Sequence, residues 1–263
     1  MNRWLLLCAL VLAPLLALAE EVPPRTADMA QALAGERWSQ LAPGLDFIRA
    51  DSKSGTRVTA FQVSANDFSI RIAVQADPDG ERVDAFGGRD DALLAINGGF
   101  FGEKEPGKGL YPVGLLRAGE RNLSAAWTKA GGYLAISADG FDLRPSGAGV
   151  PDGFEQLLQS KPMLIEPGGK WAMNTNSQLQ RWRSLLCLKP DGNLVIALVA
   201  GFGLSLFEAG WLMRGTQEGG YFGCDSALAL DGGGSSQLWV RDRSDLSARG
   251  ETPVHNAVIV VPK

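Results

Sequence analysis

Short apolar runs rich in Val, Ile, Leu and Phe recur along most of the chain, separated by Asp-Gly, Asn and Pro turns. Runs of this kind are typical of β-strands. The pattern predicts strands at 56–63, 68–75, 92–96, 132–137, 193–200, 227–230, 237–240 and 257–261. Asp139-Gly140 and Asp191-Gly192 favour hairpins or tight turns, because a positive φ costs little there. The sheet is therefore predicted to be mostly antiparallel.

The period changes in one later segment. Leu204, Phe207 and Trp211 share one face at helical spacing, and Ser205 with Glu208 forms an S-x-x-E capping box. This segment predicts a helix that delivers the chain toward a short buried strand and a glycine-rich loop. With a few helices beside the strands, and without an internal repeat or linker, the sequence predicts a single-domain α+β fold with a mostly antiparallel sheet.

The N-terminus has the order of a secretory signal peptide, with a basic start, an apolar run from Leu5 and an Ala-Leu-Ala end at Ala19. Pro14 interrupts the run, which is shorter than the roughly 20 apolar residues that a spanning helix needs. We therefore predict a cleaved signal peptide at 1–19, a periplasmic or secreted protein and no stable membrane anchor. Residues 20–45 are predicted to be a lead-in segment, and 46–263 the domain.

Charge and cysteine content bear on the possible partners of the protein and on whether it contains a disulfide bond. The chain has 25 basic and 29 acidic residues, a net charge of −4 and no basic cluster, which argues against nucleic acid as a partner. Removal of the signal peptide takes Cys8 away and leaves Cys187 and Cys224, an even number in a compartment where disulfides persist. The sequence leaves open whether these two form one bridge or remain buried thiols.

Two glycine-rich corners follow buried strands. Asn97, Gly98, Gly99 and Phe100 form the first corner, which can present a polar side chain to a ligand while an aromatic face packs on a sugar ring. The second corner is Asp231-Gly232-Gly233-Gly234-Ser235-Ser236. Its glycines permit positive φ and close approach of a ligand, and successive N–H groups there can form an anion site. Ordinary turns remain the alternative for both corners.

Together these corners resemble the phosphodiester glycosidase family. The matching segments, in the family's order, begin at Ala95 (AINGGFF), Pro112 (PVGLL), Lys161 (KPMLI), Arg183 (RSLLC), Glu208 (EAGWLM) and Leu230 (LDGGGSS). The resemblance implies hydrolysis of the bond between the anomeric carbon of a sugar and a phosphodiester oxygen. A phosphate monoester is already an acidic leaving group, so one well-placed carboxylate could suffice.

The resemblance also implies roles for individual residues. Asp231 would supply the carboxylate, as base, nucleophile or metal ligand, while Arg183 and the N–H groups of Gly232 to Gly234 would hold the phosphate. Asn97 and Ser235 would orient the sugar or the phosphate. The remaining substrate-binding candidates are Gly98, Gly99, Phe100, Ser236 and, more weakly, Lys161. The partner that the resemblance implies is a sugar phosphate or glycan.

Several alternatives remain open on sequence. The same phosphate cradle could serve a phosphodiesterase that cleaves P–O, or a non-catalytic carbohydrate-binding protein. A serine hydrolase would have to pair His255 with Ser235 or Ser236, and no G-x-S-x-G elbow is present. The single His and the two Cys lack zinc-ligand spacing. No cofactor is required by the sequence, and an oxygen-ligated Ca²⁺ or Mg²⁺ near Asp231 or Glu103 stays open.

Overall fold

The computed structural model describes residues 21–89, 91–105, 108–119, 121–127 and 131–263. The predicted signal peptide at 1–19 lies outside these residues. Within the described part of the chain, no helix is both long and apolar enough to cross a membrane.

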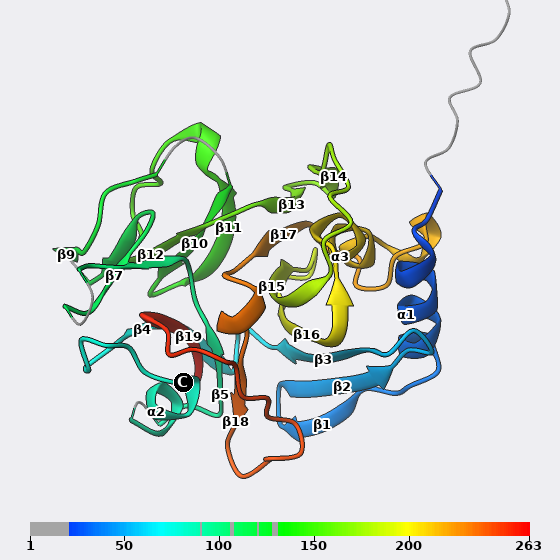
Figure 1. Ribbon diagram of the computed structural model, residues 1–263, viewed down its shortest axis with the longest axis horizontal. Coiled ribbons are helices and arrows are strands. Elements are labelled where there is room, and N and C mark those ends of the chain that lie inside the picture. The colour runs from blue at the N-terminus through cyan, green and yellow to red at the C-terminus, as the bar shows by residue number, and fades with distance from the viewer. Residues whose placement is uncertain (1–20, 90, 106–107, 120, 128–130) are drawn as a thin grey trace, which may run out of the picture.

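The largest sheet has eight strands in the order β1-β2-β3-β16-β15-β17-β13-β14 (Figure 1). Its strands are β1 (Ser39–Ala42), β2 (Leu45–Asp51), β3 (Thr56–Val63), β13 (Met163–Glu166), β14 (Lys170–Trp171), β15 (Arg181–Leu188), β16 (Leu194–Leu204) and β17 (Ser226–Ala229). Every neighbouring pair in this sheet is antiparallel.

Three smaller antiparallel sheets accompany it in the described residues. A four-stranded sheet has the order β18-β5-β19-β4, a five-stranded sheet the order β11-β10-β12-β8-β9, and β6 pairs with β7. Their strands are β4 (Phe68–Val74), β5 (Leu94–Asn97), β6 (Phe101–Glu103), β7 (Leu110–Pro112), β8 (Leu116–Ala118), β9 (Arg121–Asn122), β10 (Gly132–Ser137), β11 (Gly140–Pro145), β12 (Gln156–Ser160), β18 (Leu238–Val240) and β19 (Asn256–Pro262).

The helices are short and lie on the outside of the sheets (Figure 1). They are α1 (Pro24–Ala34), α2 (Val83–Arg89) and α3 (Leu206–Met213), with 3-10 turns η1 (Ser146–Ala148), η2 (Thr216–Glu218) and η3 (Gly233–Ser235). The predicted capping box is present at α3, where the Ser205 hydroxyl accepts from the Glu208 N–H and the Glu208 carboxylate accepts from the Ser205 N–H. The predicted α+β, mostly antiparallel fold is confirmed.

The central strands of the eight-stranded sheet are buried on both faces. Along β16, Leu194, Ile196 and Leu198 point into a core shared with the smaller sheets, while Val195 and Ala197 point into a second core beneath α1 and α3. Strands buried on both sides appear as continuous apolar runs without alternation, which is why this strand is visible in the sequence.

The lead-in segment joins the second core. Met29 and Leu33 of α1 are fully buried there, and α1 contacts both α3 and β2. The segment thus contributes to the same folded unit as the strands that follow it, and the predicted boundary at 45/46 falls at the start of β2.

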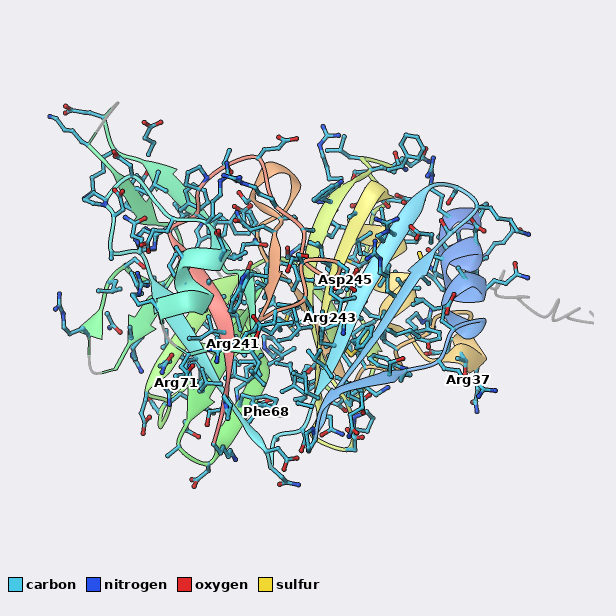
Figure 2. All side chains as sticks on the ribbon, turned by 90° about the horizontal axis from the view of Figure 1, so that it is seen from below. Arg37, Phe68, Arg71, Arg241, Arg243 and Asp245 are labelled. Atoms are coloured by element: carbon cyan, nitrogen blue, oxygen red, sulfur yellow. A yellow bond between two sulfur atoms is a disulfide. The ribbon has the colours of Figure 1, made fainter. Side chains whose placement is uncertain are left out.

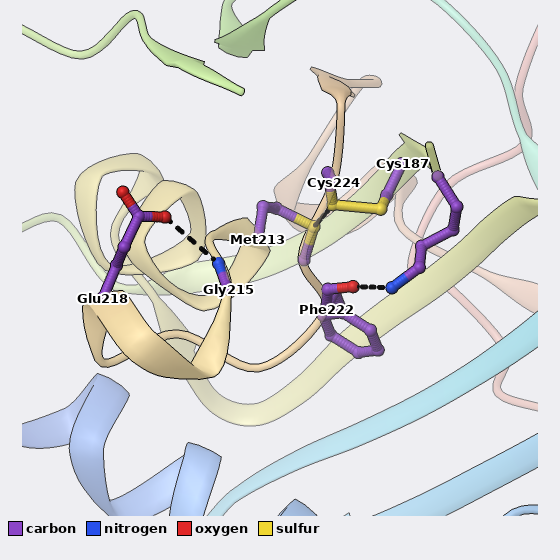
Figure 3. The surroundings of a disulfide bond; sticks show 7 residues. Cys187, Met213, Gly215, Glu218, Phe222 and Cys224 are labelled. Carbon is purple, nitrogen blue, oxygen red and sulfur yellow. Dashed lines mark hydrogen bonds between the residues drawn. A yellow bond between two sulfur atoms is a disulfide. The ribbon is translucent and has the colours of Figure 1, made fainter. Parts of the chain in front are cut away.

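Cys187 of β15 and Cys224, just before β17, form a disulfide bond (Figure 3). Their Cα atoms lie 5.5 Å apart, and both side chains are buried beside Met213 of α3. The bond links β15 to the segment just before β17 and closes a loop across 37 positions of sequence, which contains β16 and α3.

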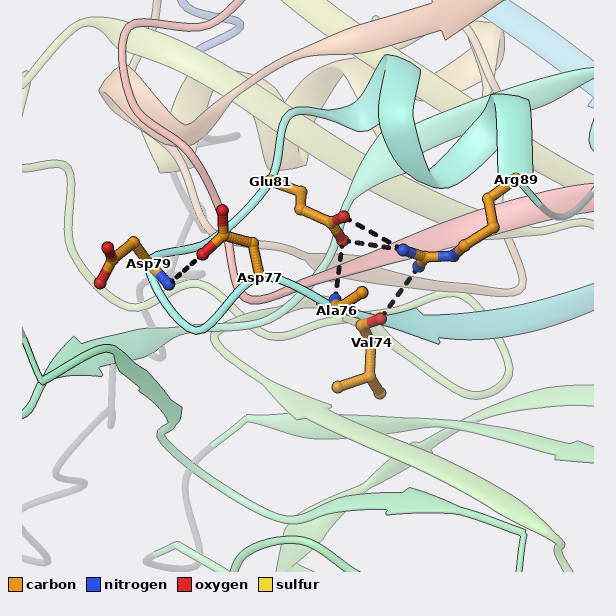
Figure 4. Close-up of polar contacts among 6 residues, drawn as sticks. All are labelled: Val74, Ala76, Asp77, Asp79, Glu81 and Arg89. Atoms are coloured by element: carbon orange, nitrogen blue, oxygen red, sulfur yellow. Dashed lines mark hydrogen bonds and ion pairs between the residues drawn. The ribbon is translucent and has the colours of Figure 1, made fainter.

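Ion pairs stabilise surface elements of the fold, including helix α2. The Arg89 guanidinium at the end of α2 contacts both Glu81 carboxylate oxygens, at 3.1 and 3.0 Å, and donates to the Val74 carbonyl at the end of β4 (Figure 4). The Glu81 carboxylate also accepts from the Ala76 N–H. These contacts hold α2 against the four-stranded sheet. Other charged side chains, among them Arg243 and Asp245, form ion pairs on the surface (Figure 2).

Candidate active site

The two predicted corners meet at the seam between two sheets. Asn97 is the last residue of β5 in the four-stranded sheet, whereas Asp231 follows β17 in the eight-stranded sheet. The Asp231 N–H donates to the Gly98 carbonyl at 3.1 Å, and the Leu230 N–H donates to the Ser184 carbonyl of β15 at 2.9 Å. Segments 134 positions apart in sequence thus form one site.

The Asn97 side chain is fully buried and makes three hydrogen bonds. Its Nδ2 donates to the Asp231 carbonyl at 2.7 Å, and its Oδ1 accepts from the Ser184 hydroxyl at 2.5 Å and from the Gln237 N–H at 3.1 Å. The side chain therefore ties both sheets together and fixes the backbone of Asp231. In this arrangement it faces the protein interior, so it can position the site rather than contact a ligand.

The glycines of the first corner are required by close packing on β19 and β12. The Gly98 and Gly99 N–H groups donate to the Asn256 carbonyl and side-chain Oδ1, at 2.9 and 2.8 Å. A Cβ at Gly98 would lie 2.0 Å from that Oδ1, and one at Gly99 would lie 3.0 Å from the Gln159 carbonyl. Both glycines are buried, so they shape the seam instead of lining an open surface.

Asp231 is the carboxylate of the second corner. Burial raises its pKa, and hydrogen bonds from the Ser235 side chain and the Gly232 N–H oppose that effect. The Gly232 N–H donates to Oδ1 at 2.9 Å. Beyond Gly232 the chain enters η3, with Gly233 at φ 64°. Because the residue is only partly exposed, its charge is held in a largely dehydrated setting.

The two serines of this corner differ in access. The Ser235 side chain is 9% exposed and interacts with Asp231, as a residue that orients the carboxylate would. Ser236 is fully buried, and within the described residues its hydroxyl has no hydrogen-bond partner. Ser236 therefore lies beneath the turn, out of reach of a ligand in this conformation.

Arg183 lies directly beside the glycine turn. Its Nε donates to the Leu204 carbonyl at 2.9 Å and its Nη2 to the Leu179 carbonyl at 2.7 Å, which fixes the guanidinium plane. Its Nη1 is 3.4 Å from the position that a Cβ at Gly232 would occupy. Burial and the charge of Arg181 lower its pKa, opposed by Glu208.

This guanidinium is a half-buried cation. Among the described residues, no ion pair joins Arg183 to Asp231 or to another carboxylate. With three N–H groups left after its two backbone bonds, it retains donors for an anion at Gly232.

The structure places Lys161 in an aromatic cluster near the first corner. Its ammonium lies 3.7 Å from the centre of the Trp127 ring, and Trp127 packs edge-on against Phe100 with ring centres 5.7 Å apart. Lys161 follows β12, whose residues Leu158 and Gln159 contact Gly99. The predicted residues Phe100 and Lys161 are thus neighbours through an aromatic ring that the sequence analysis did not single out.

His255 is placed unlike a general base for serine. It is 5% exposed, its Nδ1 lies 3.3 Å from the Asn256 amide nitrogen, and burial lowers its pKa to about 4, with a smaller contribution from Lys104. In the described residues no hydrogen bond links it to Ser235 or Ser236. This geometry gives the serine hydrolase hypothesis no support.

Metal binding stays a prediction. Among the described residues no three His, Cys, Asp or Glu side chains gather around one point. Glu103 lies on β6, at an exposed edge of the molecule.

A cavity of about 410 Å³ borders the glycine turn at Gly233 and Gly234. Its other walls come from the start of β15, the end of β16 and the loop before β19. Asp231 begins this turn and Arg183 of β15 flanks it at Gly232, but neither residue lines the cavity.

Sequence reasoning did not identify Ser184, Asn256 or Gln237. Each is a buried polar residue whose bonds fix a corner of the site. Their only sequence signal is a polar residue inside or next to an apolar run, and that signal does not identify the partner across the seam.

Solved structures of other proteins share this fold. The zebrafish N-acetylglucosamine-1-phosphodiester alpha-N-acetylglucosaminidase catalytic domain, auto-inhibited by its pro-peptide, matches with a TM-score of 0.62 at 16% identity, over 91% of this chain and 94% of that one. A hypothetical protein from Synechocystis matches with a TM-score of 0.60 at 16% identity, over 87% of this chain and 64% of that one. A Burkholderia pseudomallei protein described as exported matches with a TM-score of 0.59 at 15% identity, over 79% and 74%.

At such identities these structures show a shared fold and no more. No protein with a curated description matches the sequence. The model of the phosphodiester glycosidase family matches residues 90–261, which contain both corners, Lys161 and Arg183. On this match, which covers more than half of the sequence, the chain belongs to the phosphodiester glycosidase family.

Proposed function

We propose that this protein is an exported hydrolase that cleaves the glycosidic C–O bond of a sugar-1-phosphodiester, with Asp231 as general base. The observation that carries the proposal is the Asp231 carboxylate, which burial makes more basic and which begins the glycine turn that Arg183 flanks at Gly232. Family membership supports the reaction class, and the predicted signal peptide supports export.

Asp231 has the setting that a general base needs. A raised pKa strengthens a carboxylate as a base, provided that it stays ionised at the working pH. The Ser235 side chain and the Gly232 N–H both favour the ionised form, and they orient the group. The bond from Asn97 to the Asp231 carbonyl fixes the backbone from the other sheet.

Arg183 and the glycine turn are proposed to hold the phosphate. The fixed guanidinium retains donors next to Gly232, and an arginine fork matches two phosphate oxygens. The turn itself carries no side chain that would obstruct a phosphate, since the Cβ position at Gly233 has no atom within 4 Å.

The proposed step has a simple balance. Asp231 takes a proton from a water molecule, whose oxygen forms a bond to the anomeric carbon. The bond from that carbon to the phosphate oxygen breaks, and its electron pair leaves with the phosphate monoester. Arg183 stabilises the charge that gathers on this phosphate. Direct attack by water inverts the anomeric carbon.

The test is hydrolysis of an α-N-acetylglucosamine-1-phosphate methyl diester in ¹⁸O-labelled water, with the product anomer followed by NMR. Label in the sugar with inversion supports the proposal. Label in the sugar with retention would indicate a double displacement through a covalent intermediate and would contradict direct attack by water, and label in the phosphate would establish P–O cleavage. Tight binding without turnover across a panel of sugar-1-phosphodiesters would establish a carbohydrate-binding protein.

The matched variants are Asp231→Asn and Asp242→Asn. Asp242 is exposed and adopts a positive φ of 55°, which asparagine tolerates, so its variant controls for the loss of one carboxylate. We expect Asp231→Asn to lower kcat/KM by at least about a thousandfold and Asp242→Asn to leave it unchanged. Equal activity of the two variants would contradict the role of Asp231.

A further inference from the structure

The cavity beside the glycine turn has a distinctive lining. Besides Gly233 and Gly234, its walls include Trp182, Phe202, Arg181, Arg249 and Glu251. Two aromatic rings and two arginines thus line a space of about 410 Å³ that borders the proposed phosphate site at Gly233 and Gly234. Volumes of this order accommodate a small ligand such as a sugar unit.

Phe202 lies between two glycines with positive φ at the end of β16. This side chain is 71% exposed, and the glycines on both sides of it have φ near 71° and 72°. A Cβ at Gly201 would lie 2.3 Å from the Gly55 carbonyl, and one at Gly203 would lie 2.1 Å from the Arg181 carbonyl. Both positions therefore exclude other residues. At the bend that they create, the phenyl ring lies over Gly55, where an added Cβ would be 2.6 Å from the Phe202 Cδ2, and it stays largely exposed.

The second aromatic ring is fixed by a hydrogen bond. The Trp182 indole Nε1 donates to the Gly201 carbonyl at 3.0 Å, which holds the ring against the same bend. Aromatic faces that are exposed and held in place suit the apolar face of a pyranose ring, because stacking then orders few additional groups.

The arginines of this cavity are Arg181 and Arg249. Both are exposed, and among the described residues neither Arg181 nor Arg249 forms an ion pair. Arg181 donates only to the carbonyl of the preceding residue, Gln180, within that part of the chain. Set against Glu251, the lining keeps one formal positive charge.

The neighbouring cavity shows the opposite arrangement. It measures about 300 Å³ and shares Trp182 and Gly201 with the first. Its arginines are neutralised or occupied, since Arg57 pairs with Asp51 and Arg49 donates to the Asp245 carbonyl. Uncompensated positive charge is thus a property of the cavity at the glycine turn, not of this whole face.

We propose that this cavity binds an anionic sugar unit, which is the group esterified to the other side of the phosphate at the glycine turn. The ring packs on Phe202 and Trp182, and its phosphate or carboxylate pairs with Arg249 and Arg181. This proposal rests on the proposed function for its link to the phosphate, and it narrows the substrate class to charged sugar-phosphate chains.

Binding is tested first, without turnover. The wild-type protein is titrated with methyl glucoside 6-phosphate, methyl glucuronide and neutral methyl glucoside, and the amide NMR signals of Gly233, Gly234 and Gly250 are followed. We expect these signals to shift with one or both anionic glycosides and not with the neutral one. The more effective anion identifies the charged group as phosphate or carboxylate.

The variants are Phe202→Ala and Arg249→Gln, both at exposed positions, with Arg37→Gln as control. Arg37 is an exposed arginine that follows α1 and lines neither cavity (Figure 2). We expect the first two to weaken binding about fivefold to tenfold and the control to leave it unchanged. Absent shifts, equal binding of the neutral glycoside, or unchanged affinity in Arg249→Gln would overturn the proposal.

Turnover separates this inference from the proposed function. Two α-N-acetylglucosamine-1-phosphodiesters are compared, one with a methyl group and one with a glucuronide on the second ester. We expect kcat/KM to be about tenfold higher for the glucuronide diester and the advantage to vanish in Phe202→Ala. Equal values would overturn the inference while leaving the glycosidase function intact. If neither diester is hydrolysed, the function fails, and the NMR titration still decides whether the cavity binds anionic sugars.

Discussion

Replacing Asn97 with alanine should remove the polar link between two sheets. The substitution removes three hydrogen bonds. The Ser184 hydroxyl and the Gln237 N–H then lose their bonds to Asn97 while they remain buried, since both residues are fully inaccessible to solvent. A net contribution of about 1 kcal/mol for each bond, with some added cost for unpaired buried groups, gives about 3–4 kcal/mol of lost stability. For a domain of this size, 3 kcal/mol corresponds to about 6–12 °C in Tm.

The assay is urea unfolding followed by tryptophan fluorescence, with the catalytic rate measured below the transition. Asn122→Ala serves as the control, because Asn122 is exposed and accepts one bond from Arg117. We expect it to change the free energy of unfolding by less than about 0.5 kcal/mol. A loss below about 1 kcal/mol in Asn97→Ala, or full activity in that variant, would refute the idea that this side chain fixes Asp231.

Three further predictions follow from charge and cross-linking. Burial raises the pKa of Asp231 above 3.8, so ionisation of this carboxyl group destabilises the folded protein at neutral pH. Asp231→Asn should therefore unfold at a higher urea concentration than wild type at pH 7. This difference should disappear below pH 3.8, where the carboxyl group is protonated in both the folded and the unfolded protein. His255, with a pKa lowered from 6.5 to about 4, should titrate near pH 4 by NMR, and stability should fall as the pH drops from 6.5 through 4. Its replacement by glutamine should flatten that dependence. Joint replacement of Cys187 and Cys224 by alanine should cost about 3–4 kcal/mol in urea unfolding, since the bond closes a loop across 37 positions.

The predicted ranges located several strands of buried residues, but they missed β12, β13 and β15, whose residues are also largely buried. The predicted ranges 56–63 and 132–137 coincide with β3 and β10 because those strands consist largely of buried residues. β6 to β9 have two or three residues each and little apolar surface, so they depend on partners that a local pattern does not reveal. Their formation as strands depends on contacts with parts of the chain that are distant in sequence.

Helix α2 was missed for a related reason. It contains Gly87 and Gly88, which are poor helix formers, and it spans seven residues. It forms because Phe86 is fully buried and because Gly87 admits the Trp239 ring, which a Cβ would meet at 2.2 Å. A glycine that lowers helix propensity is here the residue that allows the helix to pack.

For the candidate site, the sequence predicted the positions of the residues better than their roles. Glycines next to Asn97 and Asp231 marked both corners, because each corner needs close backbone approach. Roles were harder to predict than positions, since the sequence offered Asn97 and Ser236 as ligand contacts and the structure buries both. Whether a polar side chain faces a ligand or the partner sheet depends on contacts across the seam, and residues such as Ser184 give no local sign of them.

The position of the site at a seam links stability to activity in two opposite ways. Asp231 carries a charge that burial disfavours, so removing that charge should stabilise the fold and abolish turnover. Asn97 holds the carboxylate by binding its backbone from the other sheet, so removing Asn97 should lower stability and turnover together. If Asp231→Asn lowered the free energy of unfolding as well as turnover, as Asn97→Ala should, Asp231 would be a structural residue. A catalytic carboxylate held in place by its fold is expected instead to give a more stable and inactive Asp231→Asn variant beside a less stable and less active Asn97→Ala variant.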